Sequence, residues 1–215
     1  MTDLQIGPPA TRATTGSEAA TPTAFRRDYQ RISLCVGGVL FIIGNMLHPL
    51  EHNDAAYHSA PWQAAHLTIF FSLPFIVVGL PFLHRKLTAR INPRLATVAV
   101  VASVFGLFGI GPGCIIEAFV APMIGHHHME ELESGGMGTV NALLGVAYLG
   151  GTIALGWALT RAKLRPRWAG PSLIGGAVTM LAVMSATGPA AGVVIISATV
   201  VYGLALATLA VKGEA

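Results

Sequence analysis

Six apolar segments follow one another along the chain, separated by short polar stretches. Each is close to the ~20 residues that an α-helix needs to cross ~30 Å of hydrocarbon. The pattern predicts an all-α integral membrane fold, a bundle of six transmembrane helices. The segments cover residues 32–50, 62–83, 95–124, 140–160, 171–187 and 191–211.

Glycine and proline are frequent inside these segments, which indicates closely packed and kinked membrane helices. The third segment contains Gly111-Pro112-Gly113, where we expect a kink or an unwound turn. Gly151 and Gly156 predict close contacts in the fourth segment. The first, third and fifth segments share a Gly-rich body and a proline near the outer end. That similarity indicates either three repeated helical hairpins or only the ordinary composition of membrane helices.

Residues 1–25 form a separate region, rich in Thr, Ala, Pro, Gly and Ser and without an apolar period. Such a segment buries too little surface to offset its ordering entropy, so we expect a disordered cytoplasmic tail. It has no apolar core of the signal-peptide kind. The transmembrane domain is then predicted to cover residues 26–215.

The basic residues predict the orientation. All 13 Lys and Arg lie before the first segment, between the second and third, between the fourth and fifth, or after the sixth. Six crossings of the cell membrane with both termini cytoplasmic satisfy the positive-inside rule at every connection. The same distribution explains the pI of ≈ 9.1 without nucleic acid as a partner. Only 11% of the residues are charged, against about 25% in soluble domains, which excludes a soluble globular enzyme as the default interpretation.

Histidine and carboxylate groups gather on the predicted outer side. All of the eight histidines except His84 fall there, with six of the ten acidic residues and no Lys or Arg. This composition is typical of a cation or metal site. Polar groups inside a membrane are costly and tend to be functional, so depth selects the candidates.

Five residues have a similar predicted depth in the first three helices: Asn45, His48, His66, Cys114 and Glu117. Glu117 lies roughly 10 Å below the end of its helix at ~1.5 Å per residue. A carboxylate at that depth is expected to be protonated, paired or metal-bound. We expect these side chains to reach one pocket in the outer third of the bundle. The alternative for each is an ordinary interhelical hydrogen bond.

The roles follow from ligand chemistry. His48 and His66 are candidate ligands of a transition metal ion or a haem, and facing histidines from two helices suit a bis-His haem. Glu117 is a third ligand or a catalytic general base, and Cys114 a fourth ligand. Asn45 is expected to orient His48.

A second candidate metal site lies in the loop that we expect after the third segment. Residues 125–138 read GHHHMEELESGGMG, so His126, His127 and His128 precede three glutamates. Such His-rich stretches bind metals, although adjacent histidines cannot all point at one ion. The alternative is a solvated loop without a ligand.

Three functions remain open from the sequence. The first is a membrane oxidoreductase or hydrolase with a metal or haem site, acting on a lipid-soluble substrate. The second is a small proton- or cation-coupled transporter, for which Glu117 binds the ion. The third is a non-catalytic membrane subunit or assembly factor.

Beyond the lipid bilayer, the partners expected are a second copy of the chain or a larger membrane complex. The sequence contains no Walker A motif and no Gly-x-Ser-x-Gly motif.

Overall fold

The computed structural model describes residues 22–51, 53–183 and 189–212, and these ranges are helical without a strand. Five helices are long and apolar enough to cross a membrane, and α7 is a shorter apolar helix. The all-helical prediction is confirmed, and the five long helices fit a membrane-embedded protein. In chain order the elements are α1 Pro22–Leu47, α2 Asp54–Tyr57, α3 Ala60–Thr88, α4 Pro93–Ile115, the π-helix η1 Ile116–Val120, α5 Ala121–Ser134, α6 Gly136–Ala162, α7 Ala169–Val183 and α8 Pro189–Lys212.

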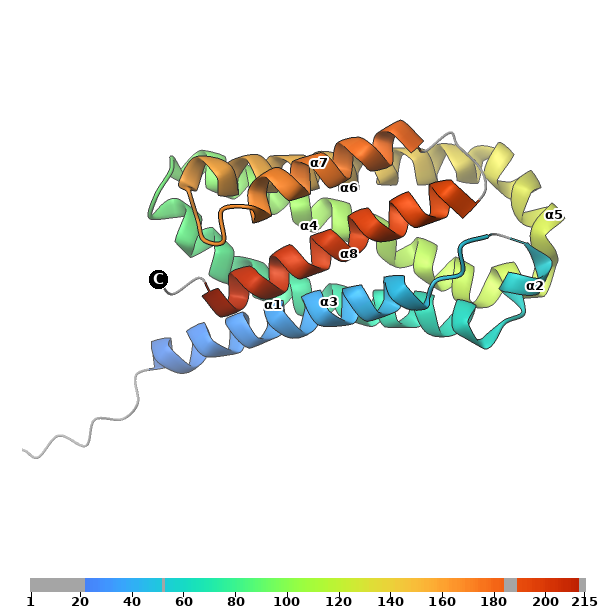
Figure 1. Cartoon of the computed structure of the whole chain (residues 1–215), viewed down its shortest axis with the longest axis horizontal. Coiled ribbons are helices and arrows are strands. Elements are labelled where there is room, and N and C mark those ends of the chain that lie inside the picture. Colours follow the sequence, from blue (N-terminus) through green and yellow to red (C-terminus); the bar gives the residue numbers. More distant parts are fainter. Residues whose placement is uncertain (1–21, 52, 184–188, 213–215) are drawn as a thin grey trace, which may run out of the picture.

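The six longest helices form a closed ring. Around it, α1 packs on α3, α3 on α4, α4 on α6, α6 on α7, α7 on α8, and α8 on α1. Figure 1 shows α2 and α5 at one end of this bundle, while α1 begins and α8 ends at the other. We call these the α5 end and the opposite end. Consecutive helices therefore pair as α1 with α3, α4 with α6, and α7 with α8.

Local capping explains where several helices begin. Ser59 precedes α3, and its hydroxyl accepts a hydrogen bond of 3.3 Å from the Trp62 N–H. Asn92 precedes α4, and its side chain accepts one of 2.9 Å from the Arg94 N–H. Both helices also have a proline in the first turn, where the missing N–H costs nothing. These capping residues are local sequence signals, and they set the residue at which each helix begins.

Glycines bring the helix backbones close together. A Cβ at Gly38 of α1 would lie 2.6 Å from the Gly203 carbonyl oxygen of α8, and a Cβ at Gly203 would lie 2.6 Å from the Gly38 oxygen. Neither position tolerates a side chain without separating the two helices. Gly151 and Gly156 make similar close contacts with α4 and α7, as expected from the sequence.

The third predicted span needs correction. The α4 helix continues through Gly111-Pro112-Gly113 without a break, and the irregular turn is η1, which starts three residues later. A helix tolerates one hydrogen bond lost to Pro112 when neighbouring helices support it. A π-turn instead widens the helix just before Pro122.

The predicted loop at 125–138 is also wrong. Most of it is helical, because α5 extends to Ser134 and α6 begins at Gly136. The chain turns at Gly125, whose φ of 78° and ψ of 169° break the helical path inside α5. The histidines then pair with the glutamates one turn later, which supports the helix. His126 lies 3.6 Å from Glu130 and His127 lies 3.6 Å from Glu131.

Two other predictions concern residues that lie partly outside the described ranges. Residues 1–21 of the predicted tail and the end of the fifth span, residues 184–187, lie outside the described residues. Residues 22–25, which we assigned to the tail, belong to α1.

Candidate functional site

A cavity of about 360 Å³ lies inside the ring, toward the α5 end. Every helix of the ring contributes to its wall, together with η1. Most of the wall is apolar, and its polar groups include the five residues that share a predicted depth. The lining residues are Phe41, Asn45, His48, Pro49, His66, Ile69, Gly109, Ile110, Gly113, Cys114, Glu117, Asn141, Leu144, Gly145, Tyr148, Met180, Gly192, Ile195, Ile196 and Thr199.

His48 and His66 face each other at this cavity. Their Nε2 atoms are 3.3 Å apart, and the ring centroids are 4.8 Å apart in an edge-on arrangement. The Nδ1 of His48 lies 2.8 Å from the Pro49 carbonyl oxygen. The Nδ1 of His66 lies 2.9 Å from the Trp62 carbonyl oxygen. Because a carbonyl oxygen only accepts, both Nδ1 atoms carry the hydrogen.

These hydrogen bonds assign the tautomers, and they place two lone pairs opposite each other. A neutral imidazole protonated at Nδ1 presents a lone pair at Nε2. The pair therefore directs two lone pairs at each other across 3.3 Å, an arrangement that a shared proton or a cation between them stabilises. Tetrahedral zinc with Zn–N distances of about 2.0–2.1 Å places two nitrogen ligands about 3.3–3.4 Å apart. The observed separation fits two ligands of one such ion.

Glu117 enters the cavity from the π-turn. Its Oε2 is buried and has no hydrogen-bond partner in the described part of the chain. Burying a carboxylate oxygen in this way is costly unless another group satisfies it. Cys114, one turn earlier, is a buried free thiol that also lines the cavity.

The main chain of Glu117 is held by Trp62. In the π-turn the Ala121 N–H donates to the Ile116 carbonyl oxygen, and Pro122 has no N–H to offer. The Glu117 carbonyl oxygen instead accepts a 2.7 Å hydrogen bond from the Trp62 indole N–H. Trp62 is completely buried and also contacts the His66 ring, with centroids 4.6 Å apart. One indole thus positions both the glutamate and the histidine pair.

A small second core lies where α2, α3 and α5 meet. It contains Tyr57, Trp62, Ala121 and Met129, and the Tyr57 ring stacks on His126 with centroids 5.8 Å apart. Burial, and then the nearby carboxylates led by Glu117, raise the pKa of Tyr57 to about 12. This core fixes α2 and α5 over the ring.

The structure does not give Asn45 the predicted role. Its side-chain amide donates a 2.8 Å hydrogen bond to the Phe41 carbonyl oxygen of its own helix. His48 is oriented by Pro49 instead, because Pro49 follows it directly and its carbonyl oxygen accepts from Nδ1.

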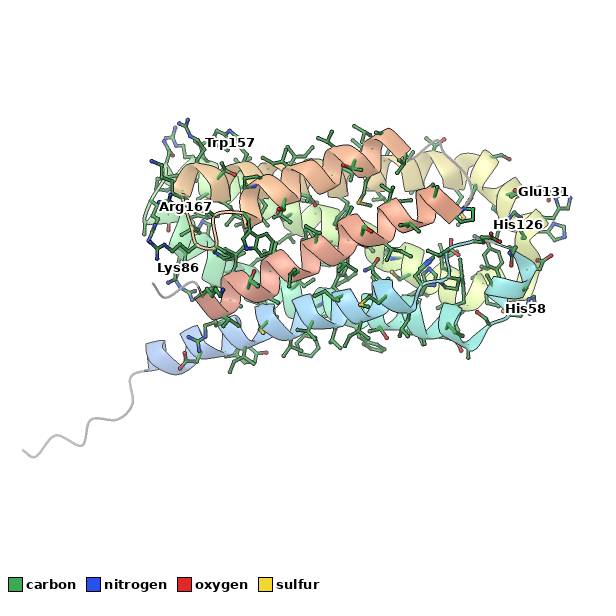
Figure 2. The ribbon with its side chains drawn as sticks, viewed as in Figure 1. His58, Lys86, His126, Glu131, Trp157 and Arg167 are labelled. Atoms are coloured by element: carbon green, nitrogen blue, oxygen red, sulfur yellow. The ribbon has the colours of Figure 1, made fainter. Side chains whose placement is uncertain are left out.

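The three adjacent histidines lie on α5, away from the cavity. The main-chain N–H of His126 donates a 2.7 Å hydrogen bond to Asp54 Oδ1, and His128 Nδ1 lies 3.1 Å from Glu131 Oε2. The side chain of His127 is 81% exposed. Figure 2 shows His126 and Glu131 at the α5 end and Lys86 and Arg167 at the opposite end. The structure does not bring these histidines to His48 and His66.

Within the described ranges, no group of three or more His, Cys, Asp or Glu side chains is arranged to hold a metal ion. The histidine pair supplies two adjacent ligand atoms, and Glu117 lines the same cavity without joining them.

Sequence reasoning missed Trp62 and Asp54. The signal for Trp62 is Pro122, which lacks an N–H five residues after Glu117 and so leaves the Glu117 carbonyl oxygen to a side-chain donor. Asp54 acts on a helix 72 residues away, and no local pattern marks such a contact. No known family model matches the chain, and no curated protein or solved structure matches it.

Proposed function

We propose that the protein binds a transition metal ion between His48 and His66 and is a membrane oxidoreductase or hydrolase acting on a lipid-soluble substrate. The observation that carries the proposal is the pair of facing Nε2 atoms. Both imidazoles donate through Nδ1 to main-chain carbonyls, so their Nε2 atoms face each other across 3.3 Å, the spacing of two nitrogen ligands on one tetrahedral ion. This is the usual arrangement of metal-binding histidines, whose second nitrogen is held by hydrogen bonding.

The rest of the cavity supplies what such an ion needs for chemistry. Two histidine ligands leave coordination positions for water and substrate, as catalytic metal sites require. Glu117 lines the same cavity, so its carboxylate is the candidate general base, or a third ligand after a side-chain rotation. Cys114 lies one turn away as a candidate fourth ligand.

The geometry favours a bare ion over a haem. A bis-His haem holds its two ligands on opposite faces of the macrocycle. Nε2 atoms 3.3 Å apart leave no room for a porphyrin between them. A cavity of about 360 Å³ is better matched to an ion with a small substrate.

The proposed topology is six crossings, of which α7 is the fifth, with both termini cytoplasmic. It is supported by the positive-inside rule and by the separation of Lys86 and Arg167 from His58, His126 and Glu131 at opposite ends of the bundle (Figure 2). The α5 end then faces outward in the cell membrane. The pairing of consecutive helices also supports three helical hairpins.

Cation transport is the second candidate. It is favoured by one observation, that all six helices of the ring line the cavity, as in transporters whose site lies between moving halves. Purified protein in sealed vesicles distinguishes the two. A transporter moves zinc to the vesicle interior, whereas the proposed enzyme binds zinc without moving it.

Metal analysis of purified protein tests the proposal. We expect about one equivalent of zinc, copper or iron per chain, retained through gel filtration. His66→Ala should abolish it, because one remaining imidazole holds an ion weakly. His127→Ala is the matched control, since that histidine is 81% exposed and lies away from the cavity. Equal metal content in all three proteins would overturn the proposal.

A further inference from the structure

We propose that the cavity binds a lipid-soluble molecule carrying a single hydroxyl group, an alcohol or a phenol, whose hydroxyl donates to Glu117 Oε2. This names the substrate class of the same site, and as a statement about the substrate it rests on the proposed function. Binding itself does not require the metal, so it can be measured separately.

The unsatisfied carboxylate oxygen calls for a hydrogen-bond donor. Glu117 Oε2 is buried and receives none from the described chain. In the wall, the Asn45 amide and the Thr199 hydroxyl each donate to carbonyl oxygens of their own helices. The Nδ1 hydrogens of His48 and His66 are used in the same way. The donor that satisfies Glu117 is therefore best supplied by a ligand.

The remainder of the cavity suits an apolar body. Phe41, Ile69, Leu144, Met180 and Ile195 come from five different helices and line its wall. A volume of about 360 Å³ is within the range of small-molecule pockets, which combine an apolar lining with a few placed polar groups. A Cβ at Gly113 would have no atom within 4 Å, so the cavity has open space beside the turn that carries Glu117.

The charges of the site select a hydroxyl among the possible donors. A carboxylic acid would meet the carboxylate of Glu117, and an ammonium group would be repelled by a metal ion at His48 and His66. A hydroxyl donates its hydrogen to the carboxylate while its oxygen lone pair remains available to the ion. It therefore satisfies both groups at once.

Trp62 provides the signal for a direct test. Its ring lies against His48 and His66, with centroids 5.1 and 4.6 Å apart. The other tryptophans, Trp157 and Trp168, are 42% and 40% exposed and are replaced together by phenylalanine, which leaves Trp62 as the single fluorophore. The probe is 4-bromo-1-naphthol, whose bromine quenches indole fluorescence. Its methyl ether, 1-bromo-4-methoxynaphthalene, keeps the apolar body and the bromine but cannot donate.

We expect saturable quenching of Trp62 by the naphthol in lipid nanodiscs and at least about tenfold weaker apparent affinity for the ether, as for loss of a hydrogen bond to a charged group. Glu117→Leu should reduce the naphthol affinity to that of the ether. Gly113→Leu, which fills the cavity without altering the carboxylate, should weaken both probes. Equal quenching by the two probes, or saturable quenching that survives both variants, would overturn the inference.

One experiment distinguishes failure of the metal site from failure of the hydroxyl site. Naphthol titrations are run on protein stripped with a chelator and on protein reloaded with zinc, and zinc content is measured in each sample. Selective naphthol binding without zinc binding upholds the hydroxyl site and overturns the metal site. Zinc binding without preference for the naphthol upholds the metal site and overturns the inference.

Discussion

Trp62→Phe tests whether the indole holds the π-turn that carries Glu117. The substitution keeps an aromatic ring in a fully buried position but removes the N–H that donates to the Glu117 carbonyl oxygen over 2.7 Å. That oxygen has no other donor in the turn, because Ala121 donates to Ile116 and Pro122 has no N–H. We expect lower stability and weaker metal binding together.

The magnitude combines two effects. Leaving a buried carbonyl unsatisfied costs about 1–3 kcal/mol in soluble proteins, and interhelical hydrogen bonds in membranes are worth about 0.6–1.7 kcal/mol. The smaller ring leaves a void that costs about 1–2 kcal/mol more. We therefore expect Trp62→Phe to lower the free energy of unfolding by about 2–4 kcal/mol. Trp157→Phe, in a residue that is 42% exposed, should change it by less than about 0.5 kcal/mol.

A double-mutant cycle separates the hydrogen bond from packing. Pro122→Ala supplies an N–H five residues after Glu117, at the spacing of a π-turn, so it can replace the indole as donor. Trp62→Phe should then cost about 1 kcal/mol less in the Pro122→Ala background. The assay is equilibrium unfolding in mixed micelles with dodecyl sulfate, followed by far-ultraviolet circular dichroism. An identical cost in both backgrounds would refute the role given to the indole N–H.

Three further predictions address other parts of the structure. Gly125→Ala should lower the free energy of unfolding by about 1–3 kcal/mol, because φ is 78° there and the added Cβ would lie 3.2 Å from Asp54 Oδ1; a thermal melt unchanged from wild type would contradict the described kink. Burial raises the pKa of Tyr57 from 10.0 to about 12, so the unfolded chain loses this proton first and stability falls as the pH rises from 10 to 12. Tyr57→Phe should flatten that fall in melts recorded against pH, and an equal slope in both proteins would contradict it. Reporter fusions after Asp54 and Glu133 should read outside and a fusion after Arg90 inside, and one reversed reporter would overturn the proposed orientation.

The apolar spans could be predicted because hydrocarbon length and hydropathy are properties of short windows of sequence. Depth reasoning also brought His48, His66 and Glu117 together, since a helix advances by a constant rise per residue. The structure places all three on one cavity. It could not be predicted that His48 Nδ1 is held by Pro49 and His66 Nδ1 by Trp62, because these bonds depend on ring orientation.

The errors have a common physical cause. The segment 125–138 was predicted as a loop from its polar composition, yet it is helical because Asp54 caps it from 72 residues away and its histidines pair with its glutamates. The break expected at Gly111-Pro112-Gly113 appears instead as η1, where Trp62 supplies the missing donor. Contacts between distant segments decided both cases, and a single sequence does not show them.

X-ray absorption of the zinc-loaded protein counts the imidazoles bound to the ion and so tests directly whether His48 and His66 hold it. We expect nitrogen scatterers at about 2.0–2.1 Å with the outer-shell pattern of two imidazole rings. His66→Ala should leave no more than one, and His127→Ala should leave both. A spectrum of wild-type protein without imidazole scattering, or a two-imidazole pattern that persists in His66→Ala, would contradict the claim that His48 and His66 bind the metal.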